Sequence, residues 1–150
     1  MKKKNYHLAQ LNIAKMKYPL EDERMAGFVN RLDEINALAE ASDGFVWRLK
    51  DETGNATNIS AFPDQSLIIN MSVWESPEHL RDYVYKSAHV EVMRMRKEWF
   101  HLMKNAYYVL WWVPAGHTPT LGEAREKLKL LRENGPTEEA FDFKTVFEKV

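Results

Sequence analysis

Cysteine is absent from this chain of 150 residues, which excludes disulfide bonds, thiolate catalysis, iron–sulfur ligation and zinc sites built on cysteine. Glycine and proline are scarce, at six residues each, and the sequence has no internal repeat or low-complexity segment. It also lacks an apolar stretch long enough for a signal peptide or a membrane helix, since the basic start is followed by Asn5, Tyr6 and His7. These absences predict a cytoplasmic protein that does not contact a membrane.

A strong excess of either charge is also missing. Lys and Arg total 21, Asp and Glu total 22, and the formal net charge is −1, so the positive field that nucleic acid binding needs is not expected. Glycine-rich phosphate loops, nucleophile elbows and His-Glu-x-x-His motifs are absent, so nucleotide, acyl-transfer and zinc-protease chemistry lack support. What is present is a 45% share of apolar residues, enough for one compact domain with a substantial core.

Hydrophobic periodicity predicts four strands and three helices. Strands are expected over residues 6–13, 44–49, 67–74 and 106–114, and helices over residues 21–38, 77–102 and 121–131. Two helix starts carry capping signals, because Ser76 precedes a proline and Thr120 stands three residues before Glu123. The order βαββαβ predicts an α+β, ferredoxin-like domain over residues 1–115, with two helices on one face of a four-stranded antiparallel sheet. Residues 116–150 are expected to form a C-terminal helical extension of the same domain.

The last predicted strand is apolar on both faces. Its two alternating sets are Tyr107, Val109, Trp111 and Val113 on one side and Tyr108, Leu110 and Trp112 on the other. Two helices can cover only one face, so a second layer must cover the other, and a second copy of the sheet in a two-fold homodimer would supply it. The alternative is that the C-terminal segment folds over that face within one chain, using Leu121, Leu128, Leu131, Phe141 and Phe143.

The predicted helix over residues 77–102 carries polar residues within its apolar arc. At about 100° per residue, His89 and Arg96 lie two turns apart on the same side as Tyr85 and Phe100. A guanidinium in such a place needs a partner or an anionic ligand, which predicts a pocket between this helix and the sheet. The alternative is that His89 fills the core, with both ring nitrogens satisfied locally.

The stretch MSVWES at residues 71–76 is followed by a helix that contains Ser87, Ala88 and His89. Together with the βαββαβ order, these residues resemble the antibiotic biosynthesis monooxygenase superfamily. The stretches YHLAQLN, GFVWRL and YYVLWWVPAGHTPT are similar to those of a bacterial family of unknown function within that superfamily. The resemblance implies a dimeric α/β barrel and hence a homodimer. It also implies a monooxygenase that oxidises an aromatic or polycyclic small molecule with the substrate's own electrons and without a cofactor.

The heme-degrading members of the superfamily offer a second resemblance. They have a similar WES turn, an Ala-His pair that supplies the heme ligand and an asparagine on the first strand. Ala88-His89 matches the pair and Asn12 matches the asparagine, whereas Tyr83 stands near the place where that family has a tryptophan. This resemblance implies heme binding through His89 as axial ligand, with Arg96 paired to a propionate.

These arguments give a set of expected site residues. His89 is expected to act as acid, base or ligand, Arg96 to anchor an anionic group, and Asn12 to lie near the reaction centre. The expected ligand-binding residues are Trp47, Tyr83, Tyr85, Trp99, Phe100, Trp111 and His117, the last in a loop at the pocket mouth. No metal is expected apart from heme iron at His89. A non-catalytic module that binds a small molecule in the same pocket is the alternative to an enzyme.

Overall fold

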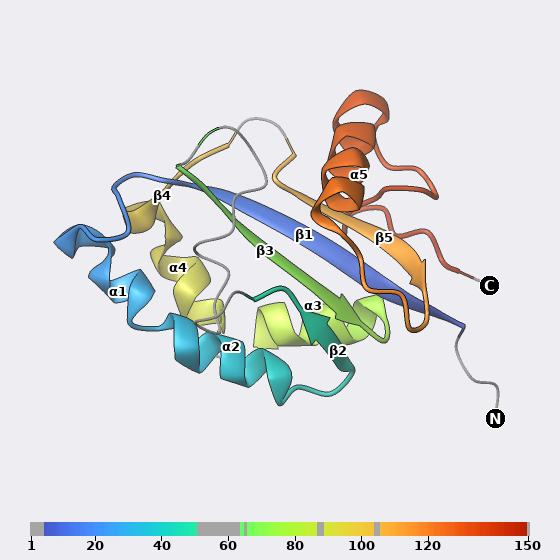
Figure 1. The fold of residues 1–150 in the computed structure, drawn as a ribbon, viewed down its shortest axis with the longest axis horizontal. Helices are drawn as coiled ribbons and strands as arrows, with labels where there is room; N and C mark the ends of the chain where they lie inside the picture. The colour runs from blue at the N-terminus through green and yellow to red at the C-terminus, as the bar shows by residue number, and fades with distance from the viewer. Residues whose placement is uncertain (1–4, 51–63, 65, 87–88, 104–105, 150) are drawn as a thin grey trace.

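An antiparallel sheet forms the centre of this α+β protein, and helices cover both of its faces (Figure 1). The computed structural model describes residues 5–50, 64, 66–86, 89–103 and 106–149, and of residues 86 and 89–93 the backbone alone. The strands are β1 (Tyr6–Met16), β2 (Phe45–Arg48), β3 (Leu67–Trp74), β4 (Phe100–His101) and β5 (Tyr108–Pro114). They lie in the order β2-β3-β1, and both β4 and β5 pair with the other edge of β1.

The first predicted helix, over residues 21–38, is broken into three pieces. They are the 3₁₀ turn η1 (Glu23–Met25), α1 (Ala26–Val29) and α2 (Leu32–Glu40). Glycine and asparagine are weak helix formers, and Gly27 and Asn30 both fall in this stretch. Gly27 also packs closely on the core, because a Cβ at this position would lie 3.2 Å from the ring of Trp99. The single continuous helix was therefore a wrong prediction.

The second predicted helix, over residues 77–102, is divided into α3 (Pro77–Lys86) and α4 (His89–Trp99). The two residues between them lie outside the described part of the chain. Helix α4 ends earlier than predicted because Phe100 and His101 pair with Met16 and Lys15 of β1 as strand β4. The Ser76 hydroxyl accepts a hydrogen bond from the backbone N–H of His79, at 3.2 Å, which confirms the predicted cap of α3.

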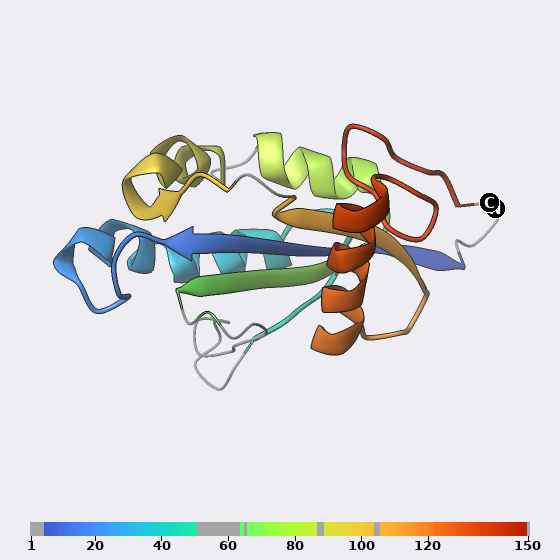
Figure 2. The ribbon, with the colours of Figure 1, turned by 90° about the horizontal axis from the view of Figure 1, so that it is seen from above.

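The C-terminal helix α5 (Leu121–Asn134) covers one face of the sheet within the same chain. Figure 2 shows it lying across β5 and β1, and Leu128 and Leu131 are buried against the face that carries Leu11, Met71 and Trp111. The helix begins as predicted, because the Thr120 hydroxyl accepts a hydrogen bond from the N–H of Glu123 at 3.1 Å. The second layer thus comes from the chain itself, so the doubly apolar sheet does not require a partner, and the homodimer stays a prediction.

The segment after α5 seals the outer edge of β5. Phe141 and Leu110 exchange two backbone hydrogen bonds of 2.9 and 2.8 Å, and the Phe141 side chain is completely buried. Phe141, Phe143 and Phe147 pack on the face opposite to α5, beside α3, and not on the face predicted for them. The Trp112 indole N–H donates to the carbonyl of Phe147 at 2.7 Å. Helix α5 and this segment therefore pack on opposite faces of the sheet at β5.

None of the helices in the described part of the chain combines the length and apolar character needed to cross a bilayer.

Candidate functional site

The register of β1 and β3 places four polar side chains in neighbouring positions on the face of the sheet that α2, α3 and α4 cover. Gln10 stands opposite Ser72, and Asn12 stands opposite Asn70. We call these four residues the polar row. Apolar pairs flank it along the same strands, with Leu8 opposite Trp74 at one end and Ala14 opposite Ile68 at the other. The polar row therefore interrupts an otherwise apolar face in the middle of the sheet.

Hydrogen bonds hold the centre of the polar row in one arrangement. The Gln10 amide nitrogen Nε2 donates to Asn70 Oδ1 at 2.6 Å and to Ser72 Oγ at 2.7 Å. Ser72 Oγ also accepts from the indole N–H of Trp74 at 2.8 Å. Gln10 is only 7% exposed and Ser72 only 6%, so both side chains need these partners.

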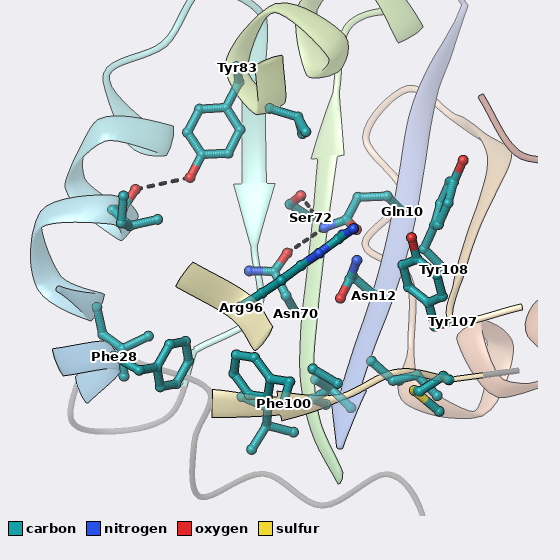
Figure 3. A pocket seen from close by; sticks show the side chains of 18 of the residues that line it. Gln10, Asn12, Phe28, Asn70, Ser72, Tyr83, Arg96, Phe100, Tyr107 and Tyr108 are labelled. Carbon is teal, nitrogen blue, oxygen red and sulfur yellow. Dashed lines mark hydrogen bonds between the residues drawn. The ribbon is translucent and has the colours of Figure 1, made fainter. Parts of the chain in front are cut away.

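A pocket of about 710 Å³ lies above the polar row, between the sheet and the helices (Figure 3). Ligand sites of this size typically combine apolar walls with a few convergent polar groups. Phe28 of α1, Tyr83 of α3 and Phe100 of β4 contribute to the walls, together with Tyr108 of β5. The pocket has room for a flat ring system of several rings.

The charges around the pocket are of one sign. Among its described lining residues none is Asp or Glu, whereas five are basic, namely Lys17, Arg31, Arg48, Arg96 and Lys97. Arg48 forms an ion pair with Glu40 at 3.3 Å, and the Lys17 ammonium donates to the carbonyl of Lys97. The Arg96 guanidinium has no hydrogen-bond or ion-pair partner among the residues that the structure describes. Since the whole chain carries a formal charge of −1, this basic lining is a local property of the pocket.

Arg96 projects from α4 into the pocket (Figure 3). Its side chain remains exposed, whereas the helical pattern placed it in an arc that faces the sheet. An exposed guanidinium keeps much of its hydration and needs no buried partner. The position is that of a cation at the open side of the pocket, available to an anionic group.

Two tyrosines of the wall are held as neutral phenols. Burial raises the pKa of Tyr83, and its hydroxyl donates to the carbonyl of Ile35 in α2 at 3.1 Å, so it ties α3 to α2. Burial also raises the pKa of Tyr108, and this outweighs the hydrogen bond that its oxygen accepts from the N–H of Phe143 at 3.0 Å. Both groups can therefore serve as hydrogen-bonding and stacking surfaces, but neither is poised as a base at neutral pH.

Five of the residues predicted from the sequence meet in this pocket, namely Asn12, Tyr83, Tyr85, Arg96 and Phe100. His89 begins α4, but its side chain lies outside the described residues, so neither its catalytic nor its core-filling role is tested. Trp99 is 3% exposed and packs with Phe28 in the core, and it is not among the residues that line the pocket.

Three other predicted residues lie away from the pocket. Trp47 and Trp111 belong to the core on the α5 side of the sheet. His117 and Trp111 both contact Glu123, because His117 Nε2 lies 2.8 Å from Glu123 Oε1 and the Trp111 indole N–H donates to Oε2 at 2.8 Å. Burial alone would raise the pKa of Glu123, but these two hydrogen bonds outweigh it and hold the pKa below its usual value. This carboxylate fastens the loop after β5 to the start of α5.

Sequence reasoning missed Gln10, Asn70 and Ser72. The signal was present, since all three alternate with buried aliphatic residues along β1 and β3 and so had to share one face of the sheet. That face is the one that the helices cover, where a polar residue is costly unless it is satisfied. Among the described residues no group of three or more His, Asp or Glu side chains is arranged to hold a metal ion.

The fold and site together describe a small α+β protein with a basic, aromatic-walled pocket between helices and sheet. The chain belongs to the family described as Domain of unknown function (DUF3291), whose model matches residues 7–150. A comparison with curated proteins found no match.

Three solved structures are similar to the chain at low sequence identity. One is the NE2512 protein of unknown function from Nitrosomonas europaea, with 12% identity, a TM-score of 0.48 and coverage of 77% of this chain and 95% of that one. The second is PA3566 from Pseudomonas aeruginosa, with 11% identity, a TM-score of 0.47 and coverage of 74% and 95%. The third is Rv0793 from Mycobacterium tuberculosis, with 10% identity, a TM-score of 0.47 and coverage of 76% and 99%.

Proposed function

We propose that the protein binds an aromatic or polycyclic small molecule in the pocket between α4 and the sheet. The observation that carries this proposal is the polar row at the floor of a pocket whose walls include Phe28, Phe100 and Tyr108. Rings stack on aromatic walls, and a few fixed polar groups orient them. If this part of the sheet served packing alone, we would expect apolar residues here, as in the pairs that flank the polar row on either side.

The ligand carries a negative charge. The described lining contains five basic residues and no acidic one, and Arg96 points into the pocket without a partner among the described residues. A guanidinium binds a carboxylate through two parallel hydrogen bonds, which gives orientation as well as affinity. We therefore place the anionic group of the ligand at Arg96 and its ring system over the polar row.

The reaction proposed for this pocket is a cofactor-independent monooxygenation. Its support is the resemblance to the antibiotic biosynthesis monooxygenase superfamily together with the presence of Asn12 on the pocket floor. In such a reaction the substrate supplies the electrons, one atom of O₂ enters the product and the other leaves as water. His89 is the proposed acid or base. A ferredoxin-like chain and its homodimer belong to the same proposal, and the strand order β2-β3-β1-β5 is compatible with it.

Replacing Arg96 with leucine is expected to weaken binding of 1-naphthoate about tenfold or more, because a charge-assisted hydrogen bond contributes about 1.5–3 kcal/mol. Isothermal titration calorimetry would measure the affinity, and circular dichroism would show that the exposed substitution leaves the fold intact. Arg94→Leu is the matched control, since Arg94 is an exposed arginine of the same helix that does not line the pocket. Equal losses in the two variants, or no loss at Arg96, would contradict the proposed anchor.

Turnover is tested with 4,5-dihydroxy-10-oxo-9H-anthracene-2-carboxylate, an anthrone that offers a carboxylate to Arg96 and whose conversion to the anthraquinone consumes one O₂ and releases one water. Oxygen uptake above the buffer rate is expected, and His89→Gln should lower kcat about 100-fold if the imidazole transfers the proton. Retained binding without oxygen uptake would identify a non-catalytic binding module instead. A parallel titration with hemin covers the heme alternative, in which a Soret shift appears with the wild-type protein and is lost in His89→Ala.

A further inference from the structure

We propose that the polar row selects ligands whose edge presents one hydrogen-bond donor and one acceptor side by side, as in a lactam or a vicinal hydroxy-carbonyl group. This inference rests on the proposed function and specifies the ligand class of the same pocket. Gln10 and Asn70 would form hydrogen bonds with the donor and the acceptor of the ligand, and Ser72 would hold the Gln10 side chain in place. The pair forms the floor of the pocket, directly below the volume that a ligand would fill (Figure 3).

The hydrogen bonds of the polar row determine what it presents to a ligand. Gln10 Nε2 uses its two N–H groups on Asn70 Oδ1 and Ser72 Oγ, at 2.6 and 2.7 Å. Gln10 Oε1 accepts no hydrogen bond from the described residues, so it remains an acceptor. Asn70 Oδ1 is engaged by Gln10, and its Nδ2 group remains a donor. One acceptor and one donor therefore stand next to each other on adjacent strands.

This pairing does not depend on which way the two amides are turned. If both amides rotate, Asn70 Nδ2 donates to Gln10 Oε1, and the Ser72 hydroxyl donates to the same oxygen while it still accepts from Trp74. Gln10 then presents its N–H group and Asn70 presents its oxygen. The exposed edge again consists of one donor and one acceptor.

The residues around Gln10 make its hydrogen bonding to a ligand selective. Ser72 is buried and receives the indole N–H of Trp74, so the side chain that orients Gln10 cannot move freely. Gln10 itself is 7% exposed, and a ligand that covers it without offering a partner would leave a buried polar atom unsatisfied. Leaving such a group unpaired costs more than an ordinary hydrogen bond contributes, and sites built to bond a donor therefore reject analogues that lack it.

The test compares three carboxylates of similar size by isothermal titration calorimetry. They are 2-oxo-1,2-dihydroquinoline-4-carboxylate, which has a donor and an acceptor side by side, coumarin-4-carboxylate, which has oxygen in place of the N–H, and 1-naphthoate, which has neither group. All three offer a carboxylate to Arg96. The quinolinone is expected to bind about tenfold or more tightly than the coumarin, in the range of one well-placed bidentate contact.

Gln10→Leu removes Oε1, the acceptor for the N–H that distinguishes the quinolinone from the coumarin, and should reduce this preference to about one while leaving the affinity for 1-naphthoate near the wild-type value. Asn70→Ala removes Nδ2, the donor to the carbonyl that both ligands carry, and should weaken the binding of both. Asn70 is exposed, so this second variant is expected to fold, whereas Gln10 is the buried end of the pair. Asn30→Ala is the matched control, because Asn30 is an exposed asparagine that does not line the pocket.

The outcomes separate the inference from the proposed function. If all three carboxylates bind the wild-type protein with equal affinity, the polar row does not select and the inference is overturned, while the pocket still binds aromatic anions. If none of the three binds at millimolar concentration, the proposed function fails and the inference fails with it. If the wild-type protein prefers the quinolinone to the coumarin but Gln10→Leu keeps this preference and Asn70→Ala weakens the binding of neither, another part of the pocket recognises the ligand. The assignment to Gln10 and Asn70 is then wrong.

Discussion

Replacing Phe141 with alanine is expected to lower the free energy of unfolding by about 3–5 kcal/mol, the range for deleting a buried phenylalanine side chain. Its side chain is fully buried, and its ring lies 6.3 Å from that of Trp112 and 6.0 Å from that of Phe147. Its backbone is paired with Leu110, so the surrounding chain cannot collapse readily into the cavity. Urea denaturation followed by circular dichroism would measure the change.

Phe147→Ala is the matched control for this substitution. Phe147 belongs to the same cluster but is only partly buried, so its removal should cost clearly less. A loss below about 1 kcal/mol in Phe141→Ala would show that the segment after α5 does not contribute to the cooperative unit.

Replacing Gly44 with alanine is expected to be the second most disruptive substitution, with a loss of about 3 kcal/mol in the free energy of unfolding. Gly44 adopts a φ of +81°, which side chains rarely tolerate, and an added Cβ would lie 2.2 Å from Cγ of His79. The contacted atoms are at the root of the imidazole, so the ring would have to leave its place. That movement would break the contact of 2.6 Å between His79 Nδ1 and Ser76 Oγ at the start of α3.

Gly116→Ala separates the two expected causes of the loss of stability in Gly44→Ala, the positive φ and the clash with His79. Gly116 also has a positive φ, of +93°, but a Cβ there would meet nothing within 4 Å. Its substitution should therefore cost only the conformational part, about 1 kcal/mol. Similar losses in the two variants, measured by thermal unfolding, would mean that the clash with His79 is relieved at no cost.

The strands were easier to predict from the sequence than the helices. Alternation located β3 at residues 67–74, and capping signals located the starts of α3 and α5. The first helix breaks between α1 and α2, at Asn30 and Arg31, although the apolar spacing continues through this stretch. β4 exists because Phe100 and His101 meet the end of β1. Such long-range contacts leave no periodic signal in a local stretch of sequence.

The candidate site was predicted only in part, because some of its residues come together through contacts between distant parts of the sequence. Helical spacing brought Tyr85, Arg96 and Phe100 together on one side, and the structure places all three on the pocket. The tryptophans were a poorer guide, since aromatic character does not tell which face of a sheet a residue occupies, and Trp111 points toward α5. The polar row depends on the register between β1 and β3, which pairs residues about 60 positions apart.

Trp74 gives the protein a built-in optical reporter of its own pocket. Its indole is 1% exposed, stacks on Tyr83 with ring centres 5.2 Å apart, and donates its N–H to the hydroxyl that also holds Gln10. If a ligand binds at Gln10 as proposed, it would change the electric field at this buried indole through Ser72. The emission wavelength of the unlabelled chain therefore carries information about what lies on the sheet, and a Trp74→Phe variant identifies the share of the signal that belongs to this residue.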